Sequence, residues 1–307
     1  MADRPAAEVA IDETLVRDLL RSQHPDLAEL PLALVDEGWD NAVWRLGDHL
    51  AVRLPRRAMA APLVRHEQEW LPVLGPALPV PVPVPARVGV PQGGYPWHWS
   101  VVPWFEGRHA IDLPVERTAS LVEPLADLVI ALHVPAPANH PVNPVRGVPL
   151  AARDAVVRER LRTVPALGPE AWGIWADAVA APRWAAAPRW IHGDLHPGNL
   201  VVGDDGSFAA VVDFGDMCAG DPATDLAVAW MLFDAAGRQR FVDKVESACG
   251  WGAPTWRRAH GWAVSFASVL LESSDDNPAY LALGRRTLAA ALAPPPVVRQ
   301  QTAPVGD

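Results

Sequence analysis

The segment from Ile191 to Asp216 reads IHGDLHPGNLVVGDDGSFAAVVDFGD and holds two polar clusters separated by two apolar runs. The runs LVV and FAAVV are joined by the letters DDG, which are typical of the turn in a β-hairpin. Because a hairpin brings the residues before its first strand close to those after its second, we expect Asp194, Asn199 and Asp213 to face one site.

Two carboxylates and an amide in one site suit phosphoryl transfer from a nucleotide. Asp194 would orient the attacking hydroxyl and accept its proton, while Asn199 and Asp213 would supply hard oxygen ligands for Mg²⁺. Two alternatives remain. His192 and His196 have the spacing of a helical zinc site, although the glycines and the proline among them oppose a helix. A solvated polar turn would explain one cluster but not the pair.

Composition limits the class of protein. The chain has 307 residues, of which 50% are hydrophobic, so it can form one large domain or two lobes. Two cysteines, no signal-peptide-like start and no long apolar run predict a cytoplasmic protein with free thiols and no membrane partner. The formal charge of -10 opposes nucleic-acid binding and mildly favours a cationic small ligand. Monomer and homodimer both remain open.

The N-terminal third alternates helix and strand patterns. Apolar spacing predicts helices over 12–23 and 62–74, with an antiparallel meander of short strands between them at 32–36, 42–46 and 50–54. The proline-rich stretch 75–87 predicts an extended connector, and 97–105 predicts a further strand.

Beyond this strand the chain is mainly helical. We place a lobe boundary after residue 103, a helical lobe over 104–293 and a disordered tail over 294–307. Helices are expected at 116–133, 149–162, 170–181, 221–236, 255–273 and 278–292.

HGDLHPGN followed by VVDFGDMCAGDPATDLA closely resembles the signature of the aminoglycoside phosphotransferase family. The resemblance implies an α+β, two-lobed, protein-kinase-like fold with a small antiparallel β-rich N-lobe (1–103) and a larger helical C-lobe. It also implies transfer of the γ-phosphate of ATP or GTP, with ATP favoured, to a small-molecule hydroxyl. By position, Asp194 is the catalytic base, Asn199 and Asp213 bind Mg²⁺, and Asp225 anchors the catalytic loop. Asp216 would either join the metal site or repel its neighbours.

The resemblance also assigns nucleotide-binding residues in the N-lobe. Gly38 and Asn41, in the turn GWDN, fall where the family has its phosphate-covering loop, although the turn alone is an ordinary one. In the hinge-like VVPWFEG, Pro103 can offer adenine only a carbonyl, and Phe105 can donate its N–H.

Arg53 occupies the position of the kinase strand lysine. We expect its acidic partner in the following helix to be Glu67 rather than Glu69. The alternative is a surface arginine on a strand.

The acceptor is less constrained than the reaction. An aminoglycoside is the leading class, as in an antibiotic-resistance enzyme, and Glu272, Asp275 and Asp276 at a helix end are candidates for its ammonium groups. A solvated helix end is equally compatible with these acids. The resemblance extends to kinases of macrolides, choline, homoserine and other sugars, and a non-catalytic nucleotide-binding protein is a further alternative.

Overall fold

A computed structural model describes residues 6–298, which divide into two compact units. One unit contains the described residues up to Glu106 together with Ala210–Gly215. The other contains Gly107–Ala209 and the described residues from Asp216 on. The division lies close to the boundary expected after residue 103. From residue 299 on, the expected tail lies outside the described residues.

The first unit is built on a five-stranded sheet with the order β1-β2-β3-β5-β4. All of its pairings are antiparallel, so the predicted meander is confirmed. The short strand β4 was not predicted, because it follows directly on the proline-rich connector. The strands are β1 (Leu32–Glu37), β2 (Asn41–Leu46), β3 (Leu50–Pro55), β4 (Arg87–Gly89) and β5 (Trp99–Pro103).

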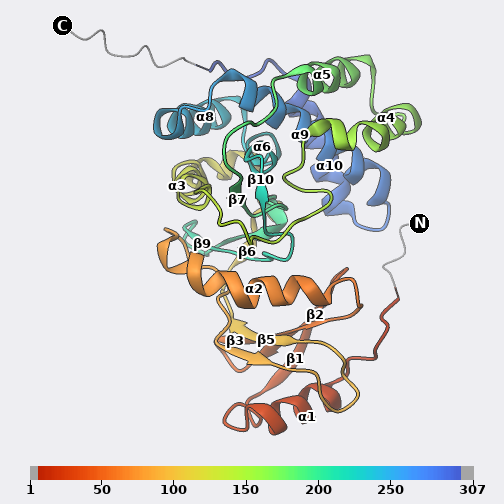
Figure 1. The fold of residues 1–307 in the computed structure, drawn as a ribbon, viewed down its shortest axis with the longest axis vertical. Helices are drawn as coiled ribbons and strands as arrows, with labels where there is room; N and C mark the ends of the chain where they lie inside the picture. Colours follow the sequence, from red (N-terminus) through yellow and green to blue (C-terminus); the bar gives the residue numbers. More distant parts are fainter. Residues whose placement is uncertain (1–5, 299–307) are drawn as a thin grey trace, which may run out of the picture. The chain divides into compact units, whose positions relative to one another are not determined.

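Two helices accompany this sheet. Figure 1 shows the sheet between α1 (Glu13–Gln23) and α2 (Ala61–Leu74). The carboxylate of Asp12 caps α1 by accepting a hydrogen bond of 2.9 Å from the backbone N–H of Leu15. Apolar side chains of α1 pack with those of β2, β3 and β5 in one core cluster. This packing fixes β3, whose Arg53 points toward α2.

The second unit is mainly helical. The long helix α9 packs against α5 and α10, and α3 packs against α8. Its strands form two small sheets, β10-β7 and β6-β8-β9, although the last two residues of β9 belong to the first unit. Figure 1 labels β6, β7, β9 and β10. The helices are α3 (Val122–Leu132), α4 (Asp154–Thr163), α5 (Pro169–Ala180), α6 (Ala223–Leu226), α7 (Val228–Leu232), α8 (Ala235–Cys249), α9 (Ala253–Ser273) and α10 (Pro278–Leu292), and the strands are β6 (Arg108–His109), β7 (Arg189–Ile191), β8 (Leu200–Val202), β9 (Phe208–Val211) and β10 (Cys218–Gly220).

The structure differs from the helices predicted from the sequence in three places. Helix α8 was not predicted, because Arg238 and Glu246 lie on its buried face and interrupt the apolar period. The expected helix over 221–236 is two short helices, α6 and α7, followed by extended backbone at Phe233. The expected helix over 116–133 begins with 3-10 turns and becomes α-helical at Val122.

The predicted hairpin is confirmed. Strands β8 and β9 are neighbours in their sheet, and the backbone N–H of Gly203 donates to the carbonyl of Ser207 across the turn at 2.9 Å. Gly206 has a φ of 81°, a left-handed conformation that glycine adopts without strain. The catalytic-loop segment therefore leads directly into β8.

None of the helices among residues 6–298 is both long and apolar enough to cross a membrane.

Candidate active site

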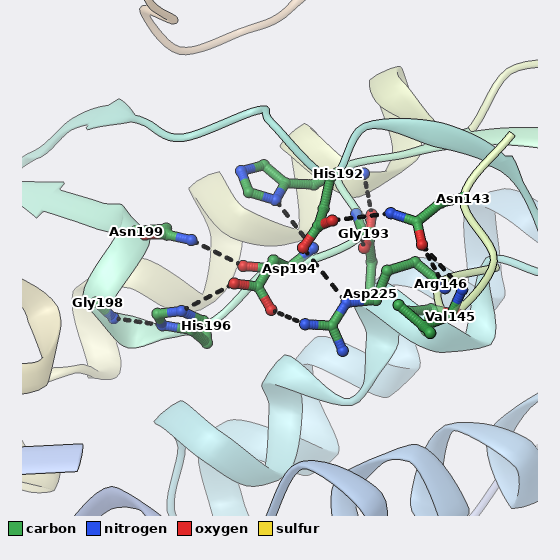
Figure 2. A network of polar contacts seen from close by, with 12 residues as sticks. Asn143, Val145, Arg146, His192, Gly193, Asp194, His196, Gly198, Asn199 and Asp225 are labelled. Atoms are coloured by element: carbon green, nitrogen blue, oxygen red, sulfur yellow. Dashed lines mark hydrogen bonds and ion pairs between the residues drawn. The ribbon is translucent and has the colours of Figure 1, made fainter. Parts of the chain in front are cut away.

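The loop between β7 and β8 is held by a buried carboxylate. Asp225, on α6, accepts hydrogen bonds from the backbone N–H groups of His192 at 2.7 Å and Gly193 at 2.9 Å. The imidazole Nε2 of His133 lies 3.0 Å from the same carboxylate. Gly193 has a φ of 86°, and a Cβ there would lie 2.3 Å from the carbonyl oxygen of Asp216. These contacts confirm Asp225 as the anchor of the loop and explain the glycine (Figure 2).

We expect Asp225→Ala to lower the free energy of unfolding by about 3–5 kcal/mol, because it leaves two buried N–H groups and a buried imidazole without their acceptor. Chemical denaturation measures this loss. Asp243→Ala, on the exposed face of α8, should change stability by less than about 0.5 kcal/mol. Equal losses in the two variants would contradict an anchoring role.

Two side chains contact the carboxylate of Asp194. Arg146 donates from Nη2 to Oδ1 at 2.7 Å, and Nε2 of His196 lies 3.3 Å from Oδ2. His196 Nδ1 accepts a hydrogen bond from the backbone N–H of Gly198 at 2.9 Å, so its proton is on Nε2 and points to Asp194. Figure 2 shows Arg146 and His196 on either side of this carboxylate.

These contacts set the charge of Asp194. Burial by itself would raise its pKa, but the charge of Arg146, followed by the interaction with His196, outweighs burial and holds the pKa of Asp194 well below its usual range. Asp194 is therefore an ionised hydrogen-bond acceptor over the whole physiological pH range. Its side chain keeps 27% of its surface exposed, so a substrate hydroxyl can reach it.

Arg146→Gln removes the main cause of this low pKa. Burial is then opposed only by His196 and His192, so we expect the pKa of Asp194 to rise and the rate to decline as the pH falls toward about 4, while the wild-type rate stays flat. Initial rates across this range, normalised to pH 8, provide the measurement. Arg146→Lys keeps a cation and should retain the flat profile. A flat profile in Arg146→Gln would show that Arg146 does not control the ionisation of Asp194.

Asn199 and Asp216 lie in the same network. The amide Nδ2 of Asn199 donates to the backbone carbonyl of Asp194 at 2.9 Å, which turns its Oδ1 away from this bond and leaves it available as a ligand. Asp216 accepts a hydrogen bond from Asn143 at 2.8 Å and lies 3.5 Å from Nε of Arg146. The amide of Asn199 thus has the chemistry of a Mg²⁺ ligand, whereas Asp216 is held by two protein groups.

The strand-rich unit contains a second polar group. Arg53, on β3, donates to Glu67 of α2 at 2.8 Å and to Asp213 at 3.0 Å. Glu67 is 3% exposed, whereas Glu69 is exposed, so the predicted pairing of Arg53 with Glu67 is confirmed. The side chain of Asp213 keeps 55% of its surface exposed. Asp213 is also the one non-glycine residue with a positive φ, 61°, among residues 6–298, and such strain often accompanies a functional site.

The other expected nucleotide-binding residues lie in the same unit. The turn between β1 and β2 is closed by a hydrogen bond of 2.9 Å from the N–H of Gly38 to the carbonyl of Asn41, and Arg56 donates to the Gly38 carbonyl at 2.6 Å. Pro103 ends β5 opposite Leu50.

The candidate acceptor acids do not form a cluster with Asp194. Glu272, on α9, is paired with Arg160 of α4 at 2.7 Å, and Asp275 and Asp276 are exposed beyond the end of this helix. Within residues 6–298, no three histidine, cysteine, aspartate or glutamate side chains gather as a metal site would require. His192 and His196 instead accept backbone hydrogen bonds within their own loop.

Arg146 was not predicted from the sequence as a site residue. It lies in the long loop between α3 and α4, which has no periodic pattern, and only the fold brings it to Asp194. The loop is rich in proline and contains a second arginine, Arg153, so the sequence by itself does not single out Arg146.

The anchored loop and the fold define a kinase-like phosphotransferase class. The model of the phosphotransferase enzyme family matches residues 32–262. The chain belongs to this family.

Solved structures of such enzymes share the fold. The GDP complex of aminoglycoside 2'-phosphotransferase-IIIa is 18% identical with a TM-score of 0.66, covering 92% of this chain and 99% of that chain. The macrolide 2'-phosphotransferase MphH from Brachybacterium faecium is 21% identical with a TM-score of 0.59, covering 92% and 98%. The expected α+β, kinase-like fold is therefore confirmed.

A curated relative matches over a shorter length. The uncharacterised protein YcbJ of Bacillus subtilis (strain 168) is 28% identical over 81 residues, which are 26% of this chain and 26% of that protein. The match thus spans about a quarter of this relative.

Proposed function

We propose that this protein transfers the γ-phosphate of a nucleoside triphosphate to a hydroxyl group of a small molecule, with Asp194 as the base. The observation that carries the proposal is the state of Asp194: an accessible, ionised carboxylate on a loop whose backbone is fixed by the buried Asp225. A preorganised proton acceptor is what attack by a hydroxyl requires.

In the reaction, the hydroxyl oxygen of the acceptor forms a bond to the γ-phosphorus while the bond from this phosphorus to the bridging oxygen breaks. The proton of the hydroxyl passes to Asp194, and the nucleoside diphosphate leaves with the electron pair. Asn199 and Asp213 carry the hard oxygen atoms that Mg²⁺ prefers and are our proposed ligands. When bound, Mg²⁺ neutralises charge on the phosphate oxygens.

The strand-rich unit supplies the nucleotide contacts in this proposal. Arg53, held by Glu67, would bind α- and β-phosphate oxygens, and the Gly38 to Asn41 turn would cover the phosphates. The hinge would offer adenine the Pro103 carbonyl and the Phe105 N–H. ATP is the favoured donor, and GTP is the alternative. Related enzymes have been solved in complex with GDP and with ATP.

For the acceptor, an aminoglycoside is one candidate, since related enzymes have been solved in complexes with kanamycin, gentamicin and streptomycin. Glu272, Asp275 and Asp276 would then hold its ammonium groups. A second candidate is an acceptor that carries a negative charge, favoured by Arg146 at Asp194 and by further arginines in the helical unit.

The test is release of nucleoside diphosphate from ATP or GTP, with and without Mg²⁺, in the presence of hydroxyl compounds. We expect release that depends on both Mg²⁺ and the acceptor, accompanied by a phosphorylated product in mass spectrometry. Nucleotide binding without stimulated release by any acceptor would favour the non-catalytic alternative.

A further inference from the structure

Two arginines contact the C-terminal half of α9, and a third ends a 3-10 turn that packs against the same helix. Arg146 stacks over Phe266 of α9, with its guanidinium carbon 5.0 Å from the ring centroid, and Arg160 pairs with Glu272 of the same helix at 2.7 Å. Phe266 and Glu272 are six residues apart, or about 9 Å along a helix axis. Arg153 ends the 3-10 turn Leu150–Arg153, which packs against both α4 and α9. The three cations therefore gather in one region of the helical unit.

Arg153 differs from the other two arginines in having no acidic partner among the described residues. Arg146 is paired with Asp194 and Arg160 with Glu272, whereas no acidic side chain in the described part of the chain forms an ion pair with Arg153. Its Nε is buried and makes no hydrogen bond. Burial, followed by the charges of Arg160 and Arg146, lowers the pKa of Arg153, in line with the lack of an acidic partner.

The nearest carboxylate along the chain does not relieve this charge. Asp154 instead accepts hydrogen bonds from Arg158 at 2.7 Å and from the indole N–H of Trp175 at 2.8 Å. Of the Arg153 nitrogens, only Nε is buried without a partner, so the Nη groups are the ones that an anion from solution can reach. A guanidinium matches a carboxylate or phosphate with two parallel hydrogen bonds, so an anion bound there would offset the repulsion from the neighbouring arginines.

We propose that Arg153, next to Arg146, binds a negatively charged group, a carboxylate or a phosphate ester, of the acceptor whose hydroxyl is phosphorylated at Asp194. Because Arg146 contacts both Asp194 and α9, and Arg153 ends a turn that packs against the same helix, a small molecule can place its hydroxyl at the carboxylate and its anionic group at Arg153. The inference rests on the proposed function and replaces a polycationic acceptor with an anionic one. Glu272 then serves to hold Arg160 rather than an ammonium group.

The phosphates of the nucleotide are the other source of a suitable anion. The proposal assigns them to Arg53 in the strand-rich unit, whereas all three arginines of this group belong to the helical unit. Separate KM values for nucleotide and acceptor distinguish these two sources.

The experiment uses matched acceptors that differ in charge: gluconate against glucose, homoserine against homoserine amide, and kanamycin as a polycation. We expect kcat/KM for gluconate and homoserine, which carry a carboxylate, to exceed that for glucose and homoserine amide by at least about tenfold. Arg153→Gln should raise KM for the acids by about 10- to 100-fold, the loss typical of a charge-assisted pair, and leave KM for the nucleotide within about twofold. Arg153→Lys should recover part of the loss.

Arg162→Gln is the matched control, because Arg162 lies on α4 with 64% of its side chain exposed. It should leave all constants unchanged. If the wild-type protein preferred kanamycin or glucose, and Arg153→Gln left this preference unaltered or made it stronger, the anion site would be overturned. The phosphotransferase function would remain intact. An effect of Arg153→Gln on the nucleotide KM alone also overturns it.

A binding measurement separates the two proposals. Calorimetric titration of gluconate and glucose into the wild-type protein and Arg153→Gln needs no turnover. Gluconate binding that depends on Arg153 supports the anion site even if no acceptor is phosphorylated, in which case only the proposed function fails. Equal binding of gluconate by both proteins, or none to either, contradicts the anion site.

Discussion

Replacing Asp194 with asparagine is expected to lower kcat by about 10²- to 10⁴-fold while nucleotide binding persists. The substitution keeps the size of the side chain and one oxygen that can accept the hydrogen bond of Arg146, but it removes the proton acceptor. Because Asp194 is not a proposed metal ligand, the substitution leaves the proposed Mg²⁺ ligands Asn199 and Asp213 unaltered. Steady-state rates at saturating acceptor, together with nucleotide titrations, measure the two effects separately.

Asp204→Asn is the control for this prediction. Asp204 lies in the β8–β9 turn with 91% of its side chain exposed, so the same chemical change there should leave kcat unaltered. If Asp194→Asn retained turnover within about threefold of the wild type, the base would have to be another group.

Arg53→Ala is expected to lower kcat/KM for the Mg-nucleotide by about 10²- to 10³-fold, the loss typical of removing one preorganised electrostatic contact. The change also leaves Glu67, which is 3% exposed, without its partner. Arg53→Lys should recover only part of the activity, because one ammonium cannot reproduce the separate bonds that Nη1 and Nη2 make to Glu67 and Asp213.

Glu67→Ala should give a smaller loss in the same direction, and the double variant should lose less than the sum of the single losses in free energy, because the two residues act as one unit. Arg87→Ala, a half-exposed arginine on β4 of the same sheet, controls for loss of charge. Thermal melts of each variant show whether the fold persists. Wild-type kcat and nucleotide KM in a folded Arg53→Ala protein would rule out a role in phosphate binding.

Local patterns in the sequence predicted the parts of the structure that depend on short-range physics. The alternation of apolar residues and the turn sequences predicted the meander β1–β3 and the hairpin β8–β9. Helical spacing predicted α1, α2, α9 and α10. The position of Arg53 in the third strand and of Glu67 in the following helix, interpreted through the family resemblance, predicted an ion pair across 14 residues that the structure confirms.

Local patterns did not predict a helix whose polar residues face the core. Helix α8 turns Arg238 and Glu246 inward, where Glu246 accepts hydrogen bonds from the indole N–H of Trp256 at 2.9 Å and the backbone N–H of Gly252 at 2.8 Å. Such partners lie on other segments, so a periodic pattern cannot show that these charges are satisfied.

The charge around the proposed base was decided by the tertiary structure alone. The sequence contains Asp194 in a recognisable loop, but its partner Arg146 comes from 48 residues earlier in a loop without regular structure. The acidic composition suggested a cationic acceptor, whereas the fold concentrates Arg146, Arg153 and Arg160 in one region of the helical unit. A net charge is a sum over the whole chain, while binding depends on the few charges that folding brings within a Debye length of the ligand.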